Sequence, residues 1–300
     1  MKRIQISILV IIILGVHCFP IFAHPGWGIE HDSKGNLFFT DIVNKTIWKL
    51  DKDGVLSAFS KEKWSHQLFI DEDDNIYICN EEYKIGNGWN SIIKISQDGN
   101  ESYIIPPIKR GIEFSGTLIA IDDNQNIYYE YNNNLYRRNS EGKYSLYITN
   151  DFGTISNLDF LNSVLYIVAP DKIFTVDSNK YLSVVAKDFI NPNPNDGAYD
   201  GRYNMVAGMD VDDNGNILFA YYGNSRVLKA LKDGSIEEIY FAEGNWYPMG
   251  VEYYDNNLYI LEEGHAQGEG PTALRIIKLQ TNKMPEIIVA LGHIGGKTVR

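Results

Sequence analysis

One short pattern recurs six times along the 300-residue chain: a strand-like apolar stretch that usually begins with Asn. Successive copies begin 39, 51, 38, 52 and 41 residues apart. This period is close to the roughly 40 to 50 residues of one propeller blade, with the longer gaps attributed to loop insertions. The copies are Asn36–Asp41, Asn75–Asn80, Asn126–Tyr131, Val164–Ala169, Asn216–Tyr221 and Asn257–Glu262.

The unit from Ala207 to Ala242 shows what each copy contains. Four short stretches rich in aliphatic and aromatic residues alternate with Asp, Asn, Gly and Lys turn signals. A four-stranded antiparallel sheet of this size cannot bury both faces alone, so it must stack on its copies. The sequence therefore predicts an all-β, six-bladed β-propeller of four-stranded antiparallel blades, formed as one domain by residues 24–300.

The same unit resembles an NHL repeat. The resemblance rests on GMDVDDNGNILFAYYGNSRVLKALKDG, residues 208–234, and on WGIEHDSKGNLFFTDIVNKTIWKLDKDG, residues 27–54. It places the chain beside the gluconolactonase/regucalcin-like and strictosidine-synthase-like propellers. That fold carries lactonases, lyases and binding modules, so the resemblance implies a fold and leaves the function open.

Residues 1–23 have the features of a secretory signal peptide. Lys2 and Arg3 precede an aliphatic run, and Ala23 is a small residue at the expected cleavage position. We therefore expect a secreted or periplasmic protein with no membrane span after cleavage; a retained anchor is the alternative, although the run is short for a span. Cys18 would suit a lipoprotein, but the residues before it fit that signal badly.

The charge of the chain is acidic. Without the leader, 25 basic residues face 39 acidic ones, a net charge of −14. Phosphate contacts need clustered Lys and Arg, so nucleic acid is excluded as the expected partner. The balance suits a cationic or metal-linked ligand, or the solubility of an exported protein. One cysteine, Cys79, remains; it lies in an expected strand and is interpreted as a buried apolar residue.

Three insertions interrupt the repeats, and each is expected to be a loop on the same face of the ring. They are residues 81–90, 191–202 and 264–272. The opposite face should carry short Asp-Asn-Gly turns such as Asp212–Asn216. Although Asp210–Gly215 begins like a calcium-binding loop, its twelfth position is Tyr221 rather than Glu, so these segments are interpreted as hairpin turns.

On the decorated face, residues at the starts of the first strands and the ends of the second strands converge on the channel mouth. Histidines and carboxylates gathered there would suit a divalent metal such as zinc, calcium or copper. The expected metal ligands are His66, His265 and His24, which belong to adjacent blades 2, 6 and 1. An N-terminal His24 could also chelate copper through its amine. The carboxylates at this mouth are Asp41, Glu81, Glu82, Glu130, Glu262 and Glu263.

A metal-assisted hydrolase or lyase acting on a small molecule follows from this grouping. Glu81 or Glu262 would complete the metal site or act as general base, and Arg202 would hold an anionic group. Trp27, Asn157 and Tyr247 are the expected ligand-binding residues.

The gluconolactonase-like propellers imply one template for the metal. In that family a Glu, two Asn and an Asp hold the ion, and Asn157 resembles one of the Asn positions. Trp27 and Ala207 stand near the expected Glu and Asp positions, so those two ligands are missing. The peptidylglycine lyase propeller, with histidine ligands to zinc, is the nearer resemblance for His66 and His265.

A non-catalytic binding module is the alternative. Many Trp and Tyr residues fall near the decorated face, and such residues suit a sugar, peptide or protein ligand. A deep pocket with convergent carboxylates and histidines would favour the enzyme, and a flat aromatic surface would favour the binding module.

Overall fold

The computed structural model describes residues 26–84, 87–109, 118–132, 134–153, 155–169, 171–189, 205–265, 271–294 and 297–299. These residues form six antiparallel sheets, each built from strands that are consecutive in the chain. The expected signal peptide, His24 and Arg202 lie outside the described residues. Among the described residues, the only helical element is the 3-10 turn η1 (Tyr222–Asn224), and no helix has the length and apolarity needed to cross a membrane.

Strands are numbered in chain order. Blade 1 contains β1 (Ile29–His31), β2 (Leu37–Asp41), β3 (Thr46–Leu50) and β4 (Leu56–Lys61). Blade 2 contains β5 (Leu68–Ile70), β6 (Ile76–Lys84), β7 (Asn87–Ile95) and β8 (Glu101–Lys109). Blade 3 contains β9 (Ile119–Ile121), β10 (Ile127–Tyr131), β11 (Asn134–Arg138) and β12 (Tyr144–Thr149).

The second half of the ring repeats this arrangement. Blade 4 contains β13 (Asn157–Leu161), β14 (Val164–Ala169), β15 (Lys172–Val176) and β16 (Leu182–Lys187). Blade 5 contains β17 (Val206–Val211), β18 (Ile217–Tyr221), β19 (Arg226–Ala230) and β20 (Ile236–Phe241). Blade 6 contains β21 (Trp246–Tyr254), β22 (Asn257–His265), β23 (Pro271–Gln280), β24 (Glu286–Ile294) and the additional edge strand β25 (Lys297–Val299).

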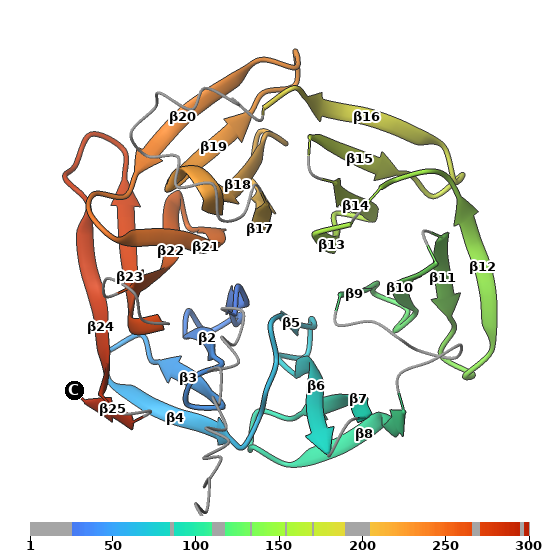
Figure 1. Cartoon of the computed structure of the whole chain (residues 1–300), viewed down its shortest axis with the longest axis horizontal. Helices are drawn as coiled ribbons and strands as arrows, with labels where there is room; N and C mark the ends of the chain where they lie inside the picture. Colours follow the sequence, from blue (N-terminus) through green and yellow to red (C-terminus); the bar gives the residue numbers. More distant parts are fainter. Residues whose placement is uncertain are drawn as a thin grey trace, which may run out of the picture.

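The six sheets surround a central axis (Figure 1). The first strand of each blade lies nearest the axis, as β5, β9 and β13 show, and the fourth lies at the rim, as β8 and β12 show. The predicted six-bladed β-propeller is therefore confirmed. We call the channel end where the innermost strands begin the upper mouth, and the end where they finish the lower mouth.

Alternating side chains of the second strands bury both faces of each sheet. On β2, Phe38 packs in the cluster shared with blade 2, while its neighbour Phe39 packs in the cluster shared with blade 6. They are 4% and 0% exposed. Burying one such ring contributes about 1.5–3 kcal/mol, so the stack of blades supplies the core that one sheet lacks.

The Asp-Asn-Gly segments are hairpin turns, as predicted. In blade 5, Asp212 Oδ1 accepts the backbone N–H groups of Asn214 (2.9 Å) and Asn216 (2.9 Å). Gly215 follows with φ +73°, a value that glycine adopts without strain. The carboxylate satisfies the turn's own donors, which explains why a sequence resembling a calcium loop closes a hairpin.

Two of the three expected loop insertions are strand extensions instead. In blade 2, β6 and β7 are nine residues each and pair as far as Lys84 and Asn87. In blade 6, β22 continues to His265, which pairs with Pro271 at the start of β23. Continued pairing satisfies backbone groups that an irregular loop would leave to water. The insertion at 191–202 lies outside the described residues.

The ring closes without a shared sheet. Among the described residues, blade 1 contains only N-terminal strands and blade 6 only C-terminal ones. Side-chain packing joins them, with Ile29, Phe39, Leu261 and Ile276 in one buried cluster. Near the axis the backbones approach so closely that a Cβ on Gly250 would lie 2.3 Å from the carbonyl oxygen of Trp27, so glycine is required there.

Candidate functional site

An amide network crosses the channel between its two mouths. The Gln67 side-chain amide of blade 2 donates to Asn157 Oδ1 (2.7 Å) and to the Leu158 carbonyl (3.1 Å) in blade 4. The side-chain oxygen Gln67 Oε1 accepts the N–H of Ile119 (3.1 Å), and the Asn157 side-chain amide donates to the backbone carbonyl of Ala207 (2.7 Å). Asn157, a predicted ligand-binding residue, is 3% exposed and links the innermost strands of blades 4 and 5.

Trp27 closes the upper mouth above this network. Its ring is 8% exposed and belongs to an apolar cluster with Ala207, Tyr222 and Met249. Tyr247 packs against the same cluster as a partly buried residue. Trp27 Nε1 is buried without a hydrogen-bond partner among the described residues.

His66 and Glu81 form one buried pair at this end. The imidazole Nδ1 lies 2.8 Å from Glu81 Oε1, and the two residues are 8% and 3% exposed. His66 lies two residues before β5, and Glu81 lies on the extended part of the adjacent strand β6. The His66 ring is also 4.9 Å from the Trp27 ring. The structure thus joins three of the predicted site residues.

His265 stands in a second pair at the end of β22. Its Nε2 atom lies 3.4 Å from Glu263 Oε1 and 3.5 Å from the Tyr222 hydroxyl. The Tyr247 ring meets the His265 ring edge-on at 5.1 Å. Tyr247 lies opposite Glu263 in the β21–β22 ladder. A carboxylate, an imidazole and a phenol therefore meet on the blade 6 side of the upper mouth.

Glu263 is a buried carboxylate with a shifted pKa in this group. It is 4% exposed, and neither carboxylate oxygen has a hydrogen-bond partner among the described residues. Burial raises the pKa of Glu263 above its ordinary value, the adjacent His265 imidazole lowers it, and the charge of Asp41 raises it further. A buried carboxylate in this state favours the uptake of a proton or a cation.

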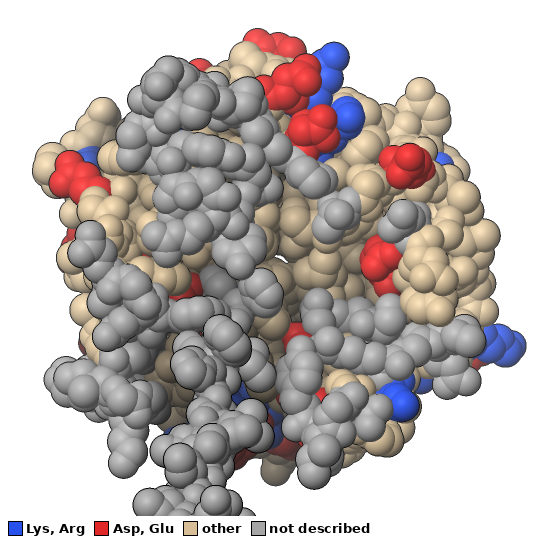
Figure 2. Space-filling view, viewed as in Figure 1, with Lys and Arg blue, Asp and Glu red and all other residues tan. Residues whose placement is uncertain are grey.

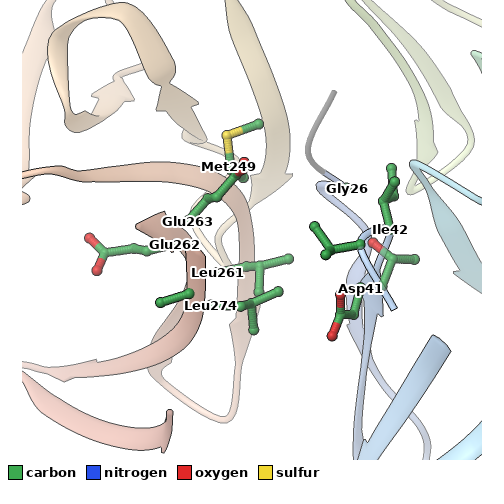
Figure 3. Close-up of a pocket in the computed structure, with 11 residues that line it drawn as sticks. Gly26, Asp41, Ile42, Met249, Leu261, Glu262, Glu263 and Leu274 are labelled. Carbon is green, nitrogen blue, oxygen red and sulfur yellow. The ribbon is translucent and has the colours of Figure 1, made fainter. Parts of the chain in front are cut away.

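Glu262 lies on the other face of β22. Its carboxylate pairs with Arg275, which also lies 4.0 Å from the centre of the Trp246 ring. Burial raises the pKa of Glu262, an effect that the Arg275 contact opposes. Figure 3 shows its side chain directed away from Asp41 and Ile42. The predicted role of Glu262 stays untested, but the neighbouring Glu263 is the carboxylate beside His265.

A small cavity lies at the junction of blades 1 and 6 (Figure 3). Its lining includes Gly26, Asp41, Met249, Leu261 and Glu263. The volume open to the centre of a water molecule is ≈ 20 Å³, enough for one water. Asp41 accepts hydrogen bonds from the Trp48 indole and from Asn44, whereas Glu263 offers free acceptors.

The predicted three-histidine metal site stays a prediction, because one of its ligands lies outside the described residues. No group of three or more His, Cys, Asp or Glu side chains in that part of the chain has the arrangement needed to hold a metal ion. His66 pairs with Glu81 on blade 2 and His265 with Glu263 on blade 6, with the Trp27 cluster at the mouth. His24 lies outside the described residues.

The sequence placed Glu263 among the carboxylates of this mouth without giving it a role, and it placed Tyr222 only among the aromatic residues near the decorated face. Strand alternation was the available signal for Glu263. Consecutive residues of a strand face opposite sides, so Glu262 and Glu263 cannot both face the same partner. Tyr222 gave no such signal, because its position depends on η1, a turn that no repeat motif predicts.

Comparison with known proteins supports the fold. No protein-family model matches the chain, and no curated protein is significantly similar to it. Solved structures do match. A catalytically inactive histidine-to-alanine variant of virginiamycin B lyase from Staphylococcus aureus with quinupristin is 16% identical, with TM-score 0.54, covering 89% of this chain and 85% of that chain.

Two further matches differ in function. The nidogen/laminin complex contains a chain that is 17% identical, with TM-score 0.60, covering 85% of this chain and 92% of its own length. Regucalcin from Agrobacterium tumefaciens, a calcium-binding protein, is 13% identical, with TM-score 0.58 and coverages of 85% and 89%. Gluconolactonases also occur among the matches. At these identities the likeness establishes a six-bladed β-propeller of the kind found in lactonases and lyases, and it establishes the fold alone.

Proposed function

We propose that the upper mouth catalyses a lyase or hydrolase reaction on a small molecule, with His265 and Glu263 as the central pair. The observation that carries the proposal is the position of His265 Nε2, within 3.5 Å of both a buried carboxylate and a tyrosine hydroxyl. An imidazole placed in this way can take a proton from a substrate and return it to a leaving group.

Each neighbour of His265 has a physical task in this scheme. The Glu263 carboxylate stabilises the imidazolium that forms when His265 takes up a proton. Tyr222 can donate its hydroxyl proton toward developing negative charge, and Tyr247 fixes the imidazole plane by its edge contact. The side chain of His265 is 17% exposed, so a substrate can reach it while Glu263 stays buried.

A divalent cation fits the same donor set. The two Glu263 oxygens are buried without hydrogen-bond partners, and the His265 imidazole is adjacent. Carboxylate and imidazole are common ligands of zinc, and a site with few protein ligands leaves positions for water and substrate. When bound, such an ion would polarise a substrate carbonyl. The calcium-binding propeller among the structural matches supports this part of the proposal.

The test is a screen of untagged protein against lactones, esters and cyclic depsipeptides, with metal content measured by mass spectrometry. We expect His265→Ala and Glu263→Gln each to reduce kcat/KM by roughly 10²- to 10⁴-fold. The matched control is Glu262→Gln, which makes the same change one residue away on the other face of β22. Equal losses in Glu262→Gln and Glu263→Gln, with both proteins folded, would reject the assigned pair.

The binding-module alternative receives less support from the geometry. Trp27 and Tyr222 are 8% and 7% exposed, and Tyr221 is fully buried. These rings pack between blades rather than forming a flat aromatic surface. Activity absent from the whole screen, together with retention on a partner protein, would favour the alternative.

A further inference from the structure

The lower mouth of the channel holds a second cavity, separate from the upper site. The volume open to the centre of a water molecule is ≈ 240 Å³, far more than one water needs. Seven of its lining residues are acidic, and none is Lys or Arg. The acidic residues are Glu30, Asp71, Glu72, Asp73, Asp122, Asp123 and Asp159.

Some of these carboxylates are used by the fold. Asp71 accepts hydrogen bonds from its turn and from the Tyr77 hydroxyl, and Asp122 accepts the equivalent bonds from Asn126 and Tyr128. Their lone pairs are occupied. A ligand would therefore depend on the other carboxylates of the cavity.

Asp159 is the informative one. It is 8% exposed and lines the cavity from β13. Its Oδ1 accepts the N–H of the adjacent Phe160 (2.7 Å), and no hydrogen bond or ion pair reaches its Oδ2 among the described residues. A carboxylate in a residue this buried is costly unless a proton or a cation reaches its free oxygen from the cavity.

The groups around Asp159 supply no cation. Glu30 of β1, Asp210 of β17 and Glu252 of β21 all act electrostatically on one another and on Asp159, and Tyr166 of β14 faces it. His31 contacts Glu252, but burial lowers its pKa to about 4, so it is neutral at pH 7. Burial also raises the pKa of Asp159 to about 8, with the Asp210 charge as the second cause.

The shape of the site favours an extended cation over a single metal ion. The carboxylates are spread between the turns at the rim and the strands inside, and no three of them are arranged to hold a metal among the described residues. Phe69, Tyr77 and Phe160 also line the cavity and offer ring faces and apolar contact. Aromatic faces and carboxylates together recognise ammonium groups joined by methylenes.

At the rim of the cavity, Lys94 of the protein itself contacts both a carboxylate and an aromatic ring. Its ammonium lies 3.4 Å from Asp71 Oδ2 and 5.2 Å from the centre of the Tyr77 ring. We propose that the lower mouth binds a linear polyamine, with one ammonium group at Asp159 and Glu30 and another at the rim carboxylates Glu72 and Asp73.

The experiment measures the thermal shift and calorimetric binding of spermidine, 1,4-diaminobutane and butylamine at low ionic strength. We expect affinity to follow the number of ammonium groups and to fall as salt is added. Binding at pH 7.5 should release protons, because a cation favours ionised Asp159. The released protons are measured as a difference in heat between buffers of different ionisation enthalpy.

Asp159→Asn and Glu30→Gln are the test variants, and Glu237→Gln on the exposed face of β20 is the control. We expect each test variant to weaken spermidine binding at least tenfold and the control to bind like the wild type. Asp159→Asn should also fold well, because it removes an unpaired buried charge. Unchanged binding in both test variants, or an equal thermal shift with MgCl₂ at matched ionic strength, would overturn the proposal.

Discussion

The buried carboxylates at the two mouths of the channel have different neighbours. At the upper mouth Glu81 and Glu263 each lie beside an imidazole, and Trp27 fills the space between the two pairs. At the lower mouth Glu30 and Asp159 face other carboxylates and an open cavity. The upper mouth is therefore nearly filled by side chains, whereas the lower mouth contains an unfilled, acidic cavity, although the same innermost strands reach both. Figure 2 also shows Asp and Glu groups at the rim and toward the centre of one face.

The largest expected effect concerns the closed mouth. Trp27→Ala removes a buried ring that contacts blades 2, 5 and 6, and we expect it to cost about 3–5 kcal/mol of unfolding free energy. Denaturant unfolding measures the loss. Trp89→Ala, at a partly exposed position on β7, is the control and should cost less. If both variants lose the same stability, the Trp27 cluster is not what closes the upper mouth.

The open mouth should make stability depend on pH. The pKa of Asp159 is raised to about 8 and that of Asp210 to about 6, so the folded state binds more protons than the unfolded state between pH 4 and 8. Stability should therefore fall as pH rises. His31, with its pKa lowered to about 4, has the opposite effect below pH 6.5, so the measurement belongs between pH 6.5 and 8.5.

We expect the free energy of unfolding to fall by roughly 2 kcal/mol between pH 6.5 and 8.5. Relaxation of the structure around the buried acids keeps the loss below the full effect of the pKa shifts. Thermal unfolding at several pH values measures it. Asp159→Asn should flatten the dependence and raise stability at pH 8.5. A wild-type protein that becomes more stable over this interval would contradict the assigned electrostatics.

The smallest expected effect on stability comes from comparing two carboxylates of the lower mouth, the hydrogen-bonded Asp122 and Asp159. Asp122→Asn makes the same change as Asp159→Asn, but Asp122 accepts four hydrogen bonds, from Asn124, Asn126 twice and Tyr128. An amide nitrogen in place of one oxygen would lose some of them. We expect a cost of about 1 kcal/mol, opposite in sign to Asp159→Asn at pH 8.5. Chemical unfolding of both variants at that pH gives the comparison.

The repeats predicted the fold because the strand and turn patterns within each repeat match the structure of one propeller blade. The alternation of Phe38 and Phe39 follows strand geometry, and the Asp212 turn follows from side chains that bond their own backbone. The repeats also placed both His66 and Glu81 at the upper mouth. They could not predict that the two side chains pair, because the contact depends on the extension of β6 beyond the repeat.

Other features depend on contacts between blades that one sequence does not encode locally. Gln67 reaches Asn157 across the channel, 90 residues away in the chain. Asp159 and the three carboxylates around it come from four different blades, and nothing in any one repeat marks them as neighbours. Such sites arise from the register of whole sheets around the axis.

The closure of the ring by side chains alone bears on how the chain can be rearranged. Because each described sheet uses consecutive strands, new termini placed between any two blades would leave every backbone ladder intact. A circular permutant opened between blades 3 and 4, with residues 26 and 299 linked, would have a covalent connection where the described residues show side-chain packing and the hydrogen bond from the His31 N–H to Glu252. The cavity between Asp41 and Glu263 lies at this junction, so an ion or ligand held there would also join the first blade to the last.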